Sequence, residues 1–213
     1  MMPYDASSRV PLVFANPSLG SPRVVTQPTQ LLDIFPTVLN LANPSSPLPP
    51  YVDGFDLSPF FQRGRDSSRP PFVVVQNHDE DISMSWFAIT NGTHKLVQYG
   101  TGEQVPPQLF NLAEDPHESV NLAPTLPNSV LALDSALRTQ IDYPSVALDV
   151  AAYQKQQLRY WVSATPNWEQ EVVKQRWKTA CNDDPVKSMR ALKAYLLNDT
   201  ISIQPCFGGT SRP

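Results

Sequence analysis

The chain has 213 residues, of which 41% are hydrophobic and 17% charged, with a formal net charge of −4. The hydrophobic fraction allows a buried core, and the acidic balance argues against a nucleic-acid-binding protein, which normally carries a basic face. No long apolar run is present, so we expect no membrane-spanning helix. The 23 prolines lie between strand-like and helix-like runs, which favours a folded chain with rigid connections over a partly disordered one.

The first 60 or so residues are predicted to hold one strand and one helix. Val10–Ala15 is a short apolar run that ends in an Asn-Pro turn, which indicates a buried strand. Apolar residues at helical spacing predict a helix over Thr29–Leu41, and Pro36 is expected to kink or split it. A lone strand with one helix cannot bury both its faces, so this segment is predicted to end a larger sheet whose other strands lie elsewhere.

Four strand signals follow, and they predict a small antiparallel sheet. Asn91-Gly92, the strongest short hairpin signal, joins the second and third of them. The four segments are Phe72–Val75, Trp86–Thr90, His94–Tyr99 and Gln108–Leu112.

The remainder of the chain is predicted to be helical. Pro166 is expected to end the second of four helices. Their ranges are Ser129–Ile141, Val146–Val162, Glu169–Cys181 and Lys187–Leu197.

Candidate metal ligands are sparse. None of the three histidines, His78, His94 and His117, is paired with a cysteine or another histidine at ligand spacing. The densest polar cluster, residues 77–81, could hold a cation through its carboxylates, but it fits a solvated loop better because it lacks the calcium-loop pattern. We predict no metal ligand from these residues.

Candidate nucleophiles are equally sparse. No Gly-x-Ser-x-Gly elbow occurs, and no Gly-rich phosphate loop precedes a helix. Cys181 and Cys206 have no histidine close in sequence; they could form a disulfide or remain two free thiols. Asn91 and Asn198 begin N-glycosylation sequons, Asn-Gly-Thr and Asn-Asp-Thr. Considered alone, the residues predict a folded chain without an evident active site.

Four stretches resemble the sulfatases of the alkaline-phosphatase-like superfamily. The first resembles the family's Tyr-Glu-(Gly/Ala)-(Gly/Ser)-x-x-Val-Pro-Leu stretch, and the last its Leu-Tyr-Asp-Leu-x-x-Asp-Pro-x-Glu-x-x-Asn-Leu-Ala stretch. They occur in the family's order, at Tyr4–Leu12, Leu32–Leu39, Asp53–Leu57 and Gln108–Ala123.

Three later stretches are similar to the tail of the arylsulfatase K branch of that family: Asp142–Ala147, Tyr153–Leu158 and Val173–Trp177. The resemblance implies an α/β (α+β) fragment from the C-terminal part of a sulfatase. Residues 1–62 would be the last strand and helix of the large α/β domain. Residues 63–125 would be the small antiparallel-sheet subdomain, and residues 126–213 a helical tail.

The resemblance also implies a chemistry, of which this chain carries little. Family members use a formylglycine made from a Cys/Ser-x-Pro-x-Arg motif, together with a calcium ion that polarises the sulfate. That motif is absent from the chain, so we expect no catalytic residue, no metal ligand and no cofactor in it. In the arylsulfatase K branch a histidine after the first strand of the small sheet borders the substrate pocket. His78 falls there, although Val75-Gln76 replaces the usual Ser-Glu pair before it.

Two hypotheses stay open from the sequence. The chain could be part of a sulfatase acting on sulfated uronate in glycosaminoglycans, inactive alone. Alternatively, it could be a non-catalytic sulfatase-like module that binds a sulfated glycan or a partner subunit. The N-terminus lacks the basic stretch and apolar core of a signal peptide, so the expectation of a lysosomal or extracellular location comes from the resemblance.

Overall fold

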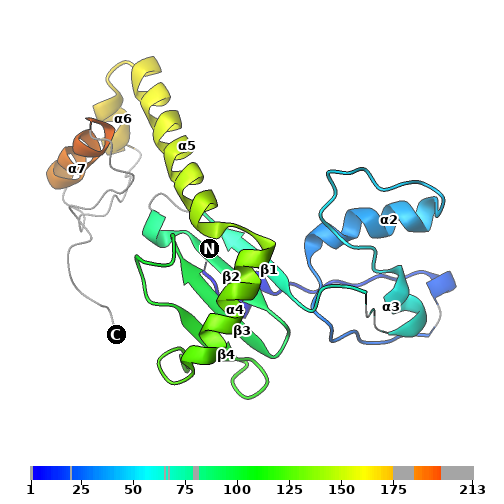
Figure 1. Cartoon of the computed structure of the whole chain (residues 1–213). Coiled ribbons are helices and arrows are strands. Elements are labelled where there is room, and N and C mark those ends of the chain that lie inside the picture. The colour runs from blue at the N-terminus through cyan, green and yellow to red at the C-terminus, as the bar shows by residue number, and fades with distance from the viewer. Residues whose placement is uncertain are drawn as a thin grey trace. The chain divides into compact units, whose positions relative to one another are not determined.

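The computed structural model describes residues 2–19, 21–64, 66, 68–78, 82–174 and 185–197 (Figure 1). The chain divides into two compact units. The first comprises Met1–Gln76, Phe87–Val97 and Pro107–Ile141, and the second Asn77–Trp86, Gln98–Pro106 and Asp142–Pro213. The division at residues 62 and 125 that the sequence suggests stays a prediction.

The predicted strand over Val10–Ala15 is wrong. This segment joins no sheet, and Val13 in its middle is 82% exposed. A strand needs a neighbour that completes its backbone hydrogen bonds, and the sheet formed by the described residues consists of other segments. Two short helical turns flank the segment, α1 (Asp5–Ser8) and η1 (Pro17–Leu19).

The predicted helix over Thr29–Leu41 forms as two pieces, a 3-10 turn η2 (Leu31–Asp33) and helix α2 (Ile34–Ala42). Pro36 is the third residue of α2. A backbone N–H at this position has no partner within a helix, so the proline breaks no helical hydrogen bond there. The segment splits just before α2 rather than at the proline.

Several apolar side chains of η2 and α2 are exposed to solvent. Exposed apolar surface of this kind is an aggregation liability when nothing covers it. The exposed fractions are 59% for Leu31 and Leu32, 52% for Phe35, 51% for Val38 and 46% for Leu41.

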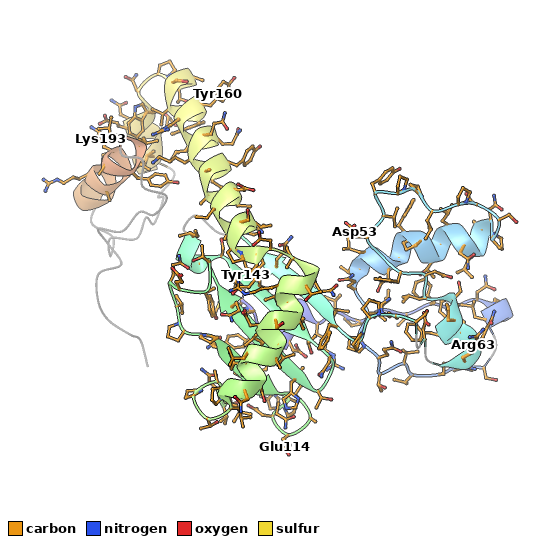
Figure 2. All side chains as sticks on the ribbon, in the orientation of Figure 1. Asp53, Arg63, Glu114, Tyr143, Tyr160 and Lys193 are labelled. Carbon is orange, nitrogen blue, oxygen red and sulfur yellow. The ribbon has the colours of Figure 1, made fainter. Side chains whose placement is uncertain are left out.

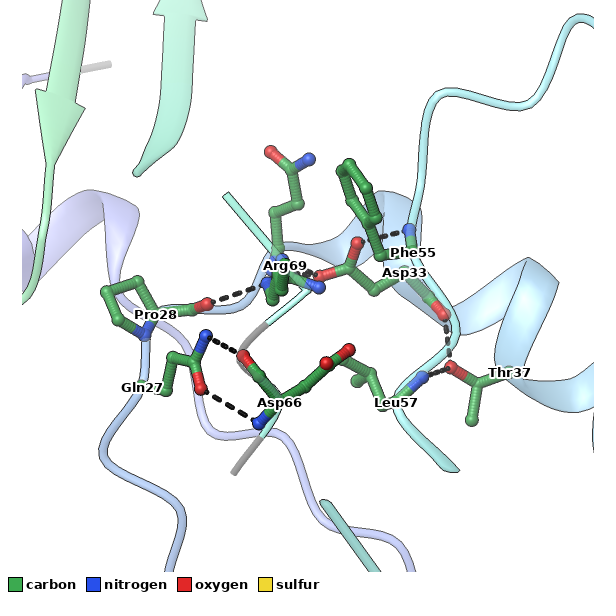
Figure 3. A network of polar contacts seen from close by, with 9 residues as sticks. Gln27, Pro28, Asp33, Thr37, Phe55, Leu57, Asp66 and Arg69 are labelled. Atoms are coloured by element: carbon green, nitrogen blue, oxygen red, sulfur yellow. Dashed lines mark hydrogen bonds and ion pairs between the residues drawn. The ribbon is translucent and has the colours of Figure 1, made fainter. Parts of the chain in front are cut away.

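A buried carboxylate joins η2 to two segments that are distant in the sequence (Figure 3). Asp33 is fully buried, and its two oxygens accept from the backbone N–H groups of Gln30 and Phe55, each at 2.8 Å. Its charge is balanced by Arg69, whose Nη2 contacts Asp33 Oδ2 and whose Nε donates to the carbonyl of Pro28 at 3.2 Å. The Arg69 guanidinium also lies over the Phe55 ring, 5.2 Å from its centroid.

A hydroxyl and a glycine fasten the same two segments a second time. Thr37 Oγ1 donates to the Asp33 carbonyl and accepts from the Leu57 N–H at 2.9 Å. The backbone at Gly54, which follows the labelled Asp53 of Figure 2, approaches so closely that a Cβ atom there would lie 2.0 Å from the carbonyl oxygen of Leu32. The stretches Leu32–Leu39 and Asp53–Leu57 are therefore held in direct backbone contact. Helix α3 (Ser58–Arg63) follows.

The four predicted strands form an antiparallel sheet in the order β1-β2-β3-β4. The second and third match their predicted ranges, and the other two differ by one or two residues at their ends. The strands are β1 (Val73–Asn77), β2 (Trp86–Thr90), β3 (His94–Tyr99) and β4 (Gln108–Asn111).

The hairpin between β2 and β3 turns at Asn91-Gly92, as predicted. Gly92 has φ +87°, a left-handed conformation that glycine adopts without steric cost. Consecutive residues of β2 and β3 are buried, so side chains on both faces of the sheet are covered. The buried apolar residues of these strands in the first unit are Phe87, Ala88, Ile89, Leu96 and Val97.

The predicted helices are confirmed over the described residues. They are α4 (Pro127–Gln140), α5 (Tyr143–Ala164), α6 (Trp168–Lys174) and α7 (Pro185–Leu197). Helix α5 ends two residues before Pro166, because a residue that precedes proline avoids the helical conformation. Glu169–Cys181 was predicted as one helix, of which the described part ends at Lys174. No helix in the described ranges is long and apolar enough to cross a membrane.

Within the second unit, α5 buries one stripe of side chains and contacts both α7 and the 3-10 turn η3 (Ile82–Met84). The stripe begins at Tyr143, labelled in Figure 2, and ends at Lys155, one residue in four. The Lys155 ammonium lies 4.7 Å from the centroid of the Tyr195 ring in α7. Arg159 donates to the carbonyl of Leu196 at 2.9 Å, near the C-terminal end of α7, where a cation is favoured.

We predict that Arg69→Met destabilises the chain strongly, because it leaves the Asp33 carboxylate buried without a counter-charge. Removing one partner of a buried ion pair costs roughly 3–5 kcal/mol of unfolding free energy. The exposed pair Arg138–Asp134 on α4, at 2.7 Å, provides the matched control. Arg138→Met is expected to cost under about 1 kcal/mol. Urea unfolding of both variants measures the difference; equal costs would contradict the prediction.

Candidate functional site

His78 is the residue for which the sequence predicts a substrate contact. It follows the last residue of β1 directly, which fixes the start of its side chain at the end of a sheet strand. The side chain is partly buried, and this burial lowers the pKa of the imidazole from its ordinary value of 6.5. Burial therefore favours the neutral form of the ring, and that form can offer hydrogen bonds but no positive charge.

The other residues singled out from the sequence lie in other elements or outside the described residues. His94 begins β3 in the first unit, and His117 is an exposed residue after β4. Residues 79–81 of the acidic cluster lie outside the described part of the chain, as do Asn198, Cys181 and Cys206. The disulfide and the second sequon therefore stay predictions.

The structure brings together a group of charged residues that the sequence did not predict. Lys95 lies in β3, where both faces of the sheet are covered, and only 2% of the residue is exposed. Its ammonium contacts two carboxylates, Asp5 Oδ1 of α1 at 2.9 Å and Glu118 Oε1 at 2.7 Å. The Asp5 backbone N–H donates to the second oxygen of Glu118. We call these three residues the Lys95 cluster.

The backbone around Glu118 turns so that the Glu118 carboxylate reaches the Lys95 ammonium. Glu118 has φ +53°, a left-handed conformation that is uncommon for a residue with a side chain. The turn that contains Glu118 is held by Asp115, whose Oδ2 accepts from the N–H groups of Ser119 and Val120 at 2.7 and 2.8 Å. Further along, the Asn121 Oδ1 accepts from Leu109 of β4 at 3.0 Å. The Gln108–Ala123 stretch thus uses its polar side chains to hold its own backbone.

The Lys95 cluster links the two ends of the family resemblance. Asp5 belongs to the Tyr4–Leu12 stretch and Glu118 to the Gln108–Ala123 stretch. The Tyr4 ring adds an edge-on contact with Phe110 of β4, with centroids 6.0 Å apart. The side chains that carry the sequence resemblance therefore pair with each other and hold the N-terminal segment on the sheet.

The described residues do not fit a calcium site. Calcium takes six to eight oxygen ligands. No three His, Cys, Asp or Glu side chains of the described ranges gather where they could hold a metal ion. Asp5 and Glu118 do converge, but the Lys95 ammonium contacts both of them, so their charge is already balanced.

We predict that His78 titrates below 6.5 in the folded chain. Because the unfolded state then binds the proton more tightly, the contribution of this group to stability falls as the pH drops below about 6.5. NMR of the imidazole Cε1–H, assigned by the signal that His78→Gln removes, measures the midpoint. A midpoint at or above the ordinary value would contradict the prediction.

We predict that Lys95→Met releases the N-terminal segment from the sheet, because the buried Glu118 carboxylate and the partly buried Asp5 carboxylate then lack their cation. The loss is roughly 3–5 kcal/mol. Hydrogen exchange should accelerate at residues 5–8 more than in β2. Arg9→Met is the control. Arg9 also lies near Asp5, with its Nη1 3.6 Å from Oδ2, but its side chain is 80% exposed. Unchanged exchange at residues 5–8 in Lys95→Met would contradict this role.

Comparison with curated proteins finds arylsulfatase K from several vertebrates. The chain is 31% identical to arylsulfatase K of Rattus norvegicus over 203 residues, which is 92% of this chain and 36% of the rat protein. The human protein is 30% identical over 203 residues, with 92% and 38% covered, and that of Danio rerio is 33% identical over 201 residues, with the same coverage. The chain thus spans little more than a third of these relatives. No family model matches it.

Solved structures overlap the chain only in part. The phosphonate monoester hydrolase of Agrobacterium radiobacter is 25% identical over 51% of this chain and 24% of its own, with a TM-score of 0.42. A protein solved with its substrate D-glucosamine-2-N,6-O-disulfate is 17% identical, and the match covers 53% of this chain and 24% of that protein, with a TM-score of 0.45. The family assignment does not depend on these overlaps. Matches to arylsulfatase K at about 30% identity cover nearly all of this chain and are consistent with the C-terminal portion of a sulfatase, so the chain belongs to the sulfatase family.

Proposed function

We propose that the chain contributes the C-terminal, non-catalytic part of a sulfuric ester hydrolase that acts on sulfated uronate in glycosaminoglycans. The observation that carries this proposal is the match to arylsulfatase K over 92% of the chain. The uronate substrate comes from the resemblance of the tail to the arylsulfatase K branch of the family.

The chain alone is then inactive. Its 213 residues contain no Cys-x-Pro-x-Arg or Ser-x-Pro-x-Arg segment from which a formylglycine could be made. The buried charges of the first unit support a structural role, because Asp33 is engaged by Arg69 and Lys95 by two carboxylates. Such groups stabilise backbone segments and are not available to a sulfate ester.

His78 would be the contribution of this chain to the substrate pocket. A neutral imidazole can accept a hydrogen bond from a sugar hydroxyl or donate one to a sulfate oxygen. Burial, which lowers the pKa of His78, favours this neutral form near pH 7. Calcium would be held by residues outside this chain, and the complete protein would be lysosomal or extracellular.

We predict that the purified chain releases no sulfate from a chromogenic aryl sulfate or from a 2-O-sulfated uronate disaccharide. A protein in which an upstream segment with the Cys-x-Pro-x-Arg motif precedes this chain, expressed with the formylglycine-generating enzyme, is expected to release it. Free sulfate measured by ion chromatography distinguishes the two.

Two variants of that longer protein sharpen the test. His78→Ala is expected to raise the KM for the sulfated disaccharide more than it lowers kcat, and His117→Ala, at an exposed position, should leave both unchanged. Turnover by the isolated chain that His78→Ala abolishes would overturn the proposal. Tight binding of the isolated chain to immobilised heparin, with no turnover by the longer protein, would instead favour a glycan-binding module.

A further inference from the structure

We propose that Asn91 carries an N-linked glycan, at the tip of the β2–β3 hairpin. Asn91-Gly92-Thr93 satisfies the acceptor sequence Asn-x-Ser/Thr. The proposal depends on passage through the secretory pathway, which the proposed location supplies, and it is independent of any sulfatase activity.

The structure places all three sequon residues where an enzyme can reach them. Asn91, Gly92 and Thr93 are each exposed, whereas the strands on either side are buried along most of their length. One side of the turn faces Pro28, since a Cβ atom at Gly92 would lie 3.2 Å from its Cγ. The Asn91 side chain itself remains open to solvent.

The side-chain hydrogen bonds of Asn91 are made by its Oδ1 and not by its Nδ2, the atom that would carry a sugar. Asn91 Oδ1 accepts from the backbone N–H groups of Thr93 and His94, at 2.9 and 2.8 Å. The backbone N–H of Asn91 donates to the His94 carbonyl at 3.2 Å, which closes the turn. An N-glycosylated asparagine is still an amide with its carbonyl oxygen, so both bonds to Oδ1 survive attachment of a sugar at Nδ2. The turn therefore accepts the glycan without rearrangement.

The transfer step needs an activated sugar donor, a glycan linked to lipid through a pyrophosphate. Asn91 Nδ2 forms a bond to the anomeric carbon and gives up one proton. The bond from that carbon to the pyrophosphate oxygen breaks, and the lipid pyrophosphate leaves with the electron pair.

The position of the glycan has a structural benefit. The hairpin is a polar tip on strongly apolar strands, and the same unit exposes the apolar side chains of η2 and α2. A large hydrophilic group at Asn91 would oppose association through such patches. It would add no contact to the folded core, so its effect is expected on solubility rather than on unfolding.

The test expresses the chain with an added secretion signal in eukaryotic cells, in an Asn198→Gln background that leaves Asn91 as the remaining sequon. Lysate and medium are both analysed, so that retention in the cell does not hide the product. Intact mass is expected to show one glycan that peptide N-glycosidase removes. An unmodified mass, with an unmodified Asn91 peptide in the digest, would overturn the proposal.

Matched variants at Thr93 separate the acceptor from the turn. The Thr93 side chain makes no hydrogen bond in the described structure, so Thr93→Ala removes the sequon and keeps the Asn91 bonds. It is expected to lose the glycan completely, and Thr93→Ser to keep it. A glycan that persists in Thr93→Ala would place the modification at another residue and contradict the assignment.

One artefact needs a control of its own. Asn-Gly sequences deamidate spontaneously, and both deamidation and the glycosidase leave an aspartate at position 91. Digestion in ¹⁸O-labelled water, with a parallel sample that lacks the glycosidase, separates them. The labelled aspartate is expected only with the enzyme; equal labelling in both samples would count as deamidation and against a glycan.

Discussion

The first unit depends on the neutralisation of Asp33. A fully buried carboxylate is tolerated only when its charge is balanced and its oxygens accept hydrogen bonds. Arg69 supplies the charge, and the backbone at Gln30 and Phe55 supplies the donors. Because these groups come from three places in the sequence, the ion pair fixes the paths of three segments at once. The long loop between α2 and α3, which forms no strand, is held in this way.

The buried polar side chains also explain why short stretches of the sequence carry the family resemblance. Asp33 and Gly54 lie in two of the four stretches, and Asp5 and Glu118 lie in the other two. In each pair one stretch binds the other: the first through the contact of Gly54 with the Leu32 carbonyl, the second through Lys95. A side chain that must meet one particular backbone group or one cation cannot vary freely. At these four positions the resemblance therefore coincides with contacts that join distant backbone segments.

The local elements of the fold could be predicted from the sequence, but its long-range contacts could not. Asn91-Gly92 between two β-rich runs predicted β2 and β3 because turn chemistry and strand propensity act within a few residues. The prediction of a strand at Val10–Ala15 was wrong because an apolar run becomes a strand only if another segment pairs with it. The Lys95 cluster joins residues 90 and 113 positions apart, and no periodicity connects them. A lysine within an apolar strand was the one available signal, since a buried ammonium needs carboxylates nearby.

The buried charged residues and His78 differ in what they could offer to a substrate. Asp33, Lys95 and Glu118 are each engaged by opposite charge, so a sulfate ester could reach them only by breaking a buried pair. Burial lowers the pKa of the His78 imidazole and so favours its neutral form. A neutral imidazole at the end of β1 can both donate and accept a hydrogen bond. A substrate contact at Asp33, Lys95 or Glu118 would break a buried ion pair, which is why the proposal places that contact at His78 instead.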